Sequence, residues 1–160
     1  PASAQAVREA VQVIAQAEKN NGVKQPIRLL LNIETPKALR EAAQLGQADP
    51  RVMGLQVGLG DLFEPLGIER REVAAVQQVM LAVRLAAGEA GVDAFDGAFA
   101  NVADTDGYLA EAQLAHRMGL SGKTCIHPSQ IALANQVFRP TDAQIRHAKK
   151  VVEDMVKAIE

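Results

Sequence analysis

Two acidic residues, Glu34 and Asp61, stand where a pair of carboxylates could do chemistry. Glu34 directly follows the apolar run of residues 27–33, and Asp61 follows two closely spaced glycines in the stretch QVGLGDLFEPLG, residues 56–67. If each residue ends a strand of one parallel sheet, neighbouring strands lie about 4.8 Å apart and both carboxylates can reach one ion. Mg²⁺ is typically held by one or two carboxylates together with waters and substrate oxygens.

Helix capping is the alternative interpretation of both carboxylates. Glu34 could cap the helix opened by Thr35 and Pro36, and Asp61 could cap the turn that follows it. A phosphate-binding loop is less well supported, because GLGDLF lacks a third glycine, a following Gly-Lys-Ser/Thr and a basic side chain close behind. From the residues alone, a metal site and helix caps both stay open.

Other polar residues are interpreted more simply. Asp96, Asp104 and Asp106 do not match the spacing of a calcium loop and lack its final Glu, so we expect solvated turns and caps. His127 is held extended by Pro128 and is as consistent with a structural as with a catalytic role.

Cys125 lies inside a predicted strand with no histidine placed to activate it, so we expect a buried, inert thiol. His116 and His147 fall within predicted helices and are expected at the surface.

The charge balance argues against two classes of partner. With 17 basic and 19 acidic side chains, the net charge of -2 gives no electrostatic reason to expect nucleic acid or an anionic membrane. No apolar run approaches the roughly 18 residues of a membrane helix. The single cysteine predicts a reducing compartment, the cytoplasm. Because the first residue is Pro rather than Met, we expect a processed or excised fragment.

Strands and helices are expected to alternate along the chain. Short, nearly continuous apolar runs are typical of strands buried on both faces of a parallel sheet, and 3.6-residue periodicity indicates helices. The predicted strands are 27–33, 51–58, 92–100 and 123–128. The predicted helices are 4–20, 36–45, 71–88, 105–118, 129–138 and 142–158. This order predicts an α/β fold, doubly wound or barrel-like, that collects ligands at the C-terminal ends of its strands.

Four segments together resemble the citrate lyase beta subunit and malyl-CoA lyase family of CoA-ester lyases. They are LLLNIETPKALREA, VGLGDLFEPLG, FDGAFANVADTDGYLAEAQLAHRMGLSGKTCIHPSQ and NQVFRPTDAQIRHAKKVVE. The resemblance runs over essentially the whole chain. It implies a (β/α)8 TIM barrel of the phosphoenolpyruvate/pyruvate type, of which residues 1–160 would be the C-terminal half, with four strands and the closing helices.

The resemblance also implies a site and an activity. It places Mg²⁺ on Glu34, in the IET stretch, and on Asp61, in the G-x-x-D-L stretch, with no catalytic residue beyond these ligands. The implied reaction cleaves a C–C bond in a CoA or acyl-carrier thioester, such as citryl-CoA or malyl-CoA, through a metal-stabilised enolate. The implied partners are a CoA thioester or 2-oxo acid and further subunits of a homotrimer. The implied substrate-binding positions are Gly60, Leu62, Ile126, His127 and Pro128.

Departures from the family pattern bear on that activity. Gly60 stands where many members have an acidic residue, which would lower the charge around the ion. Half a barrel, with an arginine that grips the substrate carboxylate, would precede Pro1, and a segment with an intersubunit aspartate would follow Glu160. Half a barrel would leave two open edges and an uncovered inner face. The alternatives are a class II pyruvate-type aldolase, against which CIHPSQ argues, and a non-catalytic CoA-ester-binding paralogue.

Overall fold

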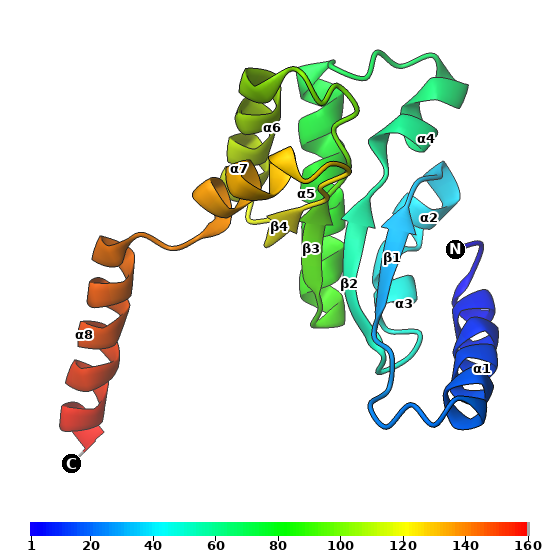
Figure 1. Cartoon of the computed structure of the whole chain (residues 1–160), viewed down its shortest axis with the longest axis horizontal. Coiled ribbons are helices and arrows are strands. Elements are labelled where there is room, and N and C mark those ends of the chain that lie inside the picture. The colour runs from blue at the N-terminus through cyan, green and yellow to red at the C-terminus, as the bar shows by residue number, and fades with distance from the viewer. Residues whose placement is uncertain (160) are drawn as a thin grey trace.

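A four-stranded parallel sheet forms the centre of the computed structural model, which describes residues 1–159 (Figure 1). The strands lie side by side in chain order, and every neighbouring pair is parallel. They are β1 (Leu29–Ile33), β2 (Val52–Val57), β3 (Asp93–Asp96) and β4 (Gly122–Lys123). The predicted α/β fold with a parallel sheet is confirmed, and the C-terminal ends of the strands meet at one end of the sheet.

Strands β3 and β4 are shorter than predicted. β3 ends at Asp96 rather than at residue 100, and Gly97 then passes so close to the Val57 carbonyl oxygen that a side chain would overlap it. β4 is confined to two residues, because β3 offers no pairing partner beyond Asp96. The segment CIHP therefore leaves the sheet as a loop rather than a strand.

The long helices lie close to their predicted positions. They are α1 (Ala4–Asn20), α5 (Val73–Ala90), α6 (Thr105–Arg117), α7 (Ser129–Phe138) and α8 (Asp142–Ile159). The helix predicted over 36–45 is instead divided at Glu41, where the backbone has φ -100° and ψ 12°, into α2 (Pro36–Arg40) and α3 (Ala42–Gly46).

The glycine-containing segment after β2, predicted as a loop, is helical. It forms α4 (Leu59–Phe63), followed by a short 3-10 helix, η1 (Glu64–Leu66). Leu59, Leu62 and Phe63 of α4 are buried, which is the i, i+3, i+4 pattern of one helix face. Five residues are too few for this periodicity to stand out beside two glycines in the sequence.

Helices cover one face of the sheet, and the hydrophobic core lies between them. Ile33, Leu55, Met80 and Val83 are fully buried there, where α5 contacts β2 and β3. Strand β1 alternates in burial, because Leu30 is exposed on the opposite face while Leu31 is buried. The apolar run predicted that β1 is buried on both faces, and this prediction is wrong for this chain.

Helix α5 is a core helix despite its composition. By length and apolar character alone, Val73–Ala90 could cross a membrane. Val76, Val79 and Ala87 of this helix are buried in the core, as are the residues that face β2 and β3, while Val73 in its first turn is exposed. The contacts of α5 with α3, β2 and β3 are those of a helix that packs on a parallel sheet.

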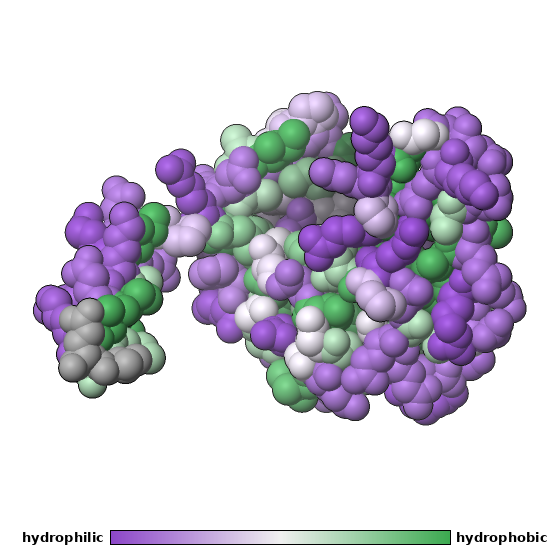
Figure 2. Space-filling model, turned by 90° about the horizontal axis from the view of Figure 1, so that it is seen from below, coloured by the Kyte–Doolittle hydropathy of each residue, from purple (hydrophilic) through white to green (hydrophobic). Residues whose placement is uncertain are grey.

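The two terminal helices differ in how they meet the sheet. α1 is joined to it by Glu18, whose carboxylate oxygens accept two hydrogen bonds from the Arg51 guanidinium at 2.7 and 2.9 Å. α8 projects away from the rest of the molecule (Figure 1), and Figure 2 shows hydrophobic atoms along one side of it. Its exposed apolar residues include Val151, Val152, Met155 and Val156.

Candidate metal and substrate site

A cavity of about 480 Å³ opens at the C-terminal ends of β1 and β2. Glu34 and Asp61 both line it, together with the amide side chains of Asn32 and Gln56 on the two strands. The structure thus brings the two predicted metal ligands into one cavity, at the end of the sheet where ligands of parallel α/β proteins bind.

The ends of β1 and β2 are held together next to these carboxylates. The Gly58 N–H donates to the Ile33 carbonyl oxygen at 2.9 Å, which extends the pairing of the two strands to the edge of the cavity. A Cβ on Gly58 would lie 2.7 Å from the Cβ of Glu34. Glycine at position 58 therefore allows the backbone that carries Glu34 to approach the segment leading to Asp61.

Neither carboxylate is a helix cap. Thr35 caps α2, because its hydroxyl oxygen accepts the Ala38 N–H at 3.1 Å. Gly58 occupies the N-cap position of α4, and Asp61 lies within the first turn of that helix. Within residues 1–159, neither the Glu34 nor the Asp61 carboxylate takes part in a hydrogen bond or ion pair with a protein group. The capping alternative is wrong for both residues, and both carboxylates remain available to a ligand.

The donors that line the cavity fit Mg²⁺. Two carboxylates are hard oxygen ligands, which this ion prefers. The amide oxygen of Gln56 accepts a hydrogen bond from the Thr124 hydroxyl at 2.8 Å. Among the described residues, no group of three or more His, Cys, Asp or Glu side chains could enclose a metal. Mg²⁺ does not require one, because it commonly keeps several waters and binds substrate oxygens directly.

Two arginines that sequence reasoning missed, Arg70 and Arg71, line the same cavity. The Arg70 guanidinium donates to Glu111 Oε1 at 3.0 Å, and Arg71 donates to Asp104 Oδ2 at 3.3 Å. Arg71 also lies over the Phe99 ring, 5.8 Å from its centroid. The available signal was a pair of basic residues between the glycine-containing stretch and the next helix.

Asp96 is buried in an ion-pair network. The prediction that it is a solvated turn or cap residue was therefore wrong. The Lys123 ammonium, itself buried, donates to Asp96 Oδ2 and to Glu111 Oε1, both at 2.6 Å, and to the Gly97 carbonyl oxygen at 3.1 Å. Burial raises the pKa of the Asp96 carboxyl, and the Lys123 charge opposes that rise. Asp104 does cap a helix as predicted, since its Oδ1 accepts the Gly107 N–H of α6.

The predicted substrate-binding residues are divided between several environments. Gly60 lines the cavity, and a Cβ there would meet no atom within 4 Å. Leu62 points into the hydrophobic core, with 3% of its surface exposed. Ile126, His127 and Pro128 are exposed outside the cavity lining, and His127 Nδ1 accepts the Ser129 N–H at 3.2 Å. Their role in substrate binding stays a prediction.

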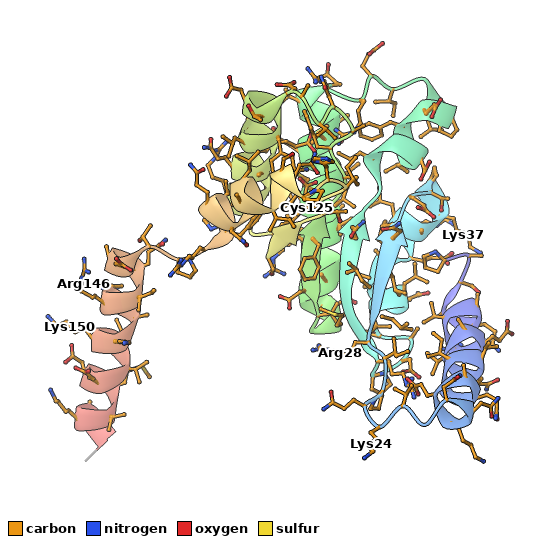
Figure 3. The ribbon with its side chains drawn as sticks, in the orientation of Figure 1. Lys24, Arg28, Lys37, Cys125, Arg146 and Lys150 are labelled. Carbon is orange, nitrogen blue, oxygen red and sulfur yellow. The ribbon has the colours of Figure 1, made fainter. Side chains whose placement is uncertain are left out.

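Cys125 lies beside α6 and α7 (Figure 3), half-buried in a loop rather than in a strand. Its sulfur is 3.3 Å from the hydroxyl of Tyr108. Burial, and then the contact with Cys125, raise the pKa of Tyr108. Gln130, which was not predicted as important, joins the loops after β3 and β4: it accepts from the Ile126 N–H and donates to the Phe99 carbonyl oxygen.

Known proteins resemble this chain in sequence and in structure. The chain is 33% identical over 158 residues to the citrate lyase subunit beta of Haemophilus influenzae, covering 98% of this chain and 54% of that protein. It is 27% identical over 164 residues to an L-malyl-CoA/beta-methylmalyl-CoA lyase of Rhodobacter capsulatus, covering 91% and 52%. The chain therefore spans about half the length of the curated relatives it matches.

A solved structure of the citrate lyase beta subunit from M. tuberculosis, complexed with oxaloacetate and magnesium, has a similar fold. It superimposes with a TM-score of 0.66 at 27% identity and covers 88% of this chain and 59% of that chain. The family described as HpcH/HpaI aldolase/citrate lyase matches residues 2–128. With the parallel sheet and the paired carboxylates in place, these matches show that the chain belongs to the HpcH/HpaI aldolase/citrate lyase family.

Proposed function

We propose that the protein carrying this chain is a Mg²⁺-dependent lyase that cleaves a C–C bond in a CoA or acyl-carrier thioester. The observation that carries this proposal is that Glu34 and Asp61 line one cavity. Among the described residues, neither carboxylate is engaged in a hydrogen bond or ion pair. The names of the relatives support it, because citrate lyase beta subunits and malyl-CoA lyases are carbon–carbon lyases.

The residues that line the cavity would have separate roles in binding Mg²⁺ and substrate. Glu34 and Asp61 would act as ligands of Mg²⁺ rather than as bases, and the Asn32 and Gln56 amides would border the space left for substrate. When bound, Mg²⁺ supplies positive charge that stabilises the enolate formed as the bond breaks. The open space at Gly60 would admit substrate oxygens next to Asp61.

We further propose that the sheet is the C-terminal half of a (β/α)8 barrel. Three observations support this: the strands follow chain order, all are parallel, and helices cover one face only. The exposed inner-face residue Leu30 on β1 would be covered by the remaining strands. From the family resemblance we also propose a homotrimer, and from the single cysteine a cytoplasmic location.

The test of activity uses the protein that carries this chain with citryl-CoA and malyl-CoA in the presence of Mg²⁺. Release of acetyl-CoA or a 2-oxo acid, lost with EDTA and in a Glu34→Ala variant, is the expected result. Binding of the CoA esters without turnover of either one would contradict the lyase proposal and support the non-catalytic alternative.

A further inference from the structure

Arg70 lies at the outer end of a chain of alternating charges that begins inside the protein and ends at the cavity. Asp96 on β3, Lys123 on β4 and Glu111 on α6 are the inner members. We propose that Arg70 is an anion-binding residue of the site, held in place by Glu111, and that it binds a carboxylate or phosphate oxygen of the substrate. This inference rests on the proposed function, since it assigns a substrate group to the same cavity.

The inner members of the chain are fixed. The ammonium of Lys123 has three N–H donors, and the structure supplies three acceptors: Asp96 Oδ2, the Gly97 carbonyl oxygen and Glu111 Oε1. The Asp96 and Lys123 side chains are both 0% exposed, so this group has little freedom to rearrange. Glu111 is thereby anchored from the protein side, with 13% of its side chain exposed.

The charges of this network favour a guanidinium at its outer end. A buried Lys123–Asp96 pair is neutral by itself, and Glu111 adds one negative charge at the wall of the cavity. Arg70 supplies the balancing positive charge through its contact of 3.0 Å with Glu111 Oε1. Because the lysine uses the same carboxylate oxygen, the arginine is held by an acceptor that cannot swing away.

Most of the hydrogen-bonding capacity of Arg70 is still available. Within residues 1–159 its guanidinium donates one hydrogen bond, to Glu111, and a guanidinium carries five N–H donors. With 34% of its side chain exposed, it can be reached from the cavity that it lines. An arginine with free N–H donors facing a cavity is suited to bind a carboxylate or phosphate group, which it holds through paired N–H groups.

The charge of the whole cavity points to the same ligand class. Mg²⁺ bound to Glu34 and Asp61 would neutralise both carboxylates, and Glu111 on the same lining balances one of the two arginines, so the lining would keep one net positive charge. A 2-oxo acid offers a carboxylate, and CoA offers phosphates. Both are anionic oxygen groups, and binding experiments can separate them.

The experiment is calorimetry on the protein that carries this chain, with Mg²⁺ alone, with oxaloacetate in excess Mg²⁺, and with CoA alone. The variants are Arg70→Ala, Arg70→Lys and, as a control, Arg146→Ala on α8, which Figure 3 shows far from the sheet. A charge-assisted hydrogen bond contributes about 1.5–3 kcal/mol, so Arg70→Ala should raise the Kd of one ligand about 10- to 100-fold. Arg70→Lys should recover part of this affinity, and the control should bind like the wild type.

The outcomes separate the two proposals. Weaker oxaloacetate binding identifies a carboxylate, and weaker CoA binding identifies a phosphate. If Arg70→Ala lowers only the melting temperature and leaves both affinities unchanged, or if the wild type binds neither ligand, the assignment of Arg70 is wrong. Failure of the wild type to bind Mg²⁺ would instead contradict the proposed function, and the CoA titration would still test Arg70.

Discussion

Gly58 and Glu34 are in direct contact: a Cβ added to Gly58 would lie 2.7 Å from Glu34 Cβ and 3.2 Å from Glu34 Cα. Real Cβ atoms do not approach this closely, and the atoms involved belong to or adjoin the backbone, so they cannot swing aside. The distance between the predicted ligand Glu34 and the end of β2 therefore depends on glycine, which has no side chain, at position 58.

Gly58→Ala should displace Glu34 and weaken Mg²⁺ binding. We expect about a tenfold or greater rise in the Kd for Mg²⁺ and a loss of about 1–3 kcal/mol in the free energy of unfolding, as overpacking typically costs. Gly60→Ala is the matched control, because its Cβ would meet nothing within 4 Å and the residue lies in α4. Calorimetry and urea unfolding check both; equal behaviour of the two variants would contradict the steric argument.

Lys123→Met should destabilise the fold strongly. The substitution leaves Asp96 buried without its partner, and breaking one side of a buried ion pair costs about 3–5 kcal/mol. Urea unfolding measures the loss. The double variant Asp96→Asn, Lys123→Met removes the unpaired charge and should recover part of the stability. A double variant no more stable than the single one would show that the unpaired charge is not the cause.

The ion pair between Glu18 and Arg51 predicts an acid dependence of stability. The hydrogen bond from Arg51, followed by that from the Ile27 N–H, holds the pKa of Glu18 below its ordinary value of 4.5. A lowered folded-state pKa gives stability that is present above pH 4.5 and lost as the pH falls through the lowered value.

Glu18→Gln should therefore lower the melting temperature at pH 7 and have a smaller effect at pH 3. Thermal unfolding at both values tests this. Glu9→Gln on the same helix is the control, since Glu9 makes no ion pair among the described residues and accepts only from the exposed Gln5 side chain. An effect of Glu18→Gln that is equal at both pH values would contradict the linkage.

The sequence was informative wherever a pattern depends on neighbours along the chain. The apolar run before Glu34, the Thr35–Pro36 start of α2 and the long periodicity of α5 all predicted their elements correctly. It failed where an outcome depends on distant partners. The length of β4 is set by where β3 ends, and Asp96 is buried because Lys123, 27 residues further along, supplies its counter-charge.

The same limit applies to the candidate site. Glu34 and Asp61 were found because each follows a recognisable strand. Arg70 belongs to a connecting segment, and its place on the cavity follows from the packing of α6 and the contact with Glu111. Spacing alone also could not exclude helix caps, whereas the hydrogen bond to Thr35 and the position of Asp61 inside α4 do exclude them.

The central claim is that Glu34 and Asp61 together hold Mg²⁺, and calorimetric titration of Mg²⁺ tests it most directly. Glu34→Ala and Asp61→Ala should each abolish binding, because each removes one of the two carboxylates that line the cavity. Glu64→Ala is the control, since this exposed acidic residue of η1 lies outside that lining. Loss of binding in the first two variants and retention in the third is the predicted result; unchanged Mg²⁺ affinity in both Glu34→Ala and Asp61→Ala would contradict the account.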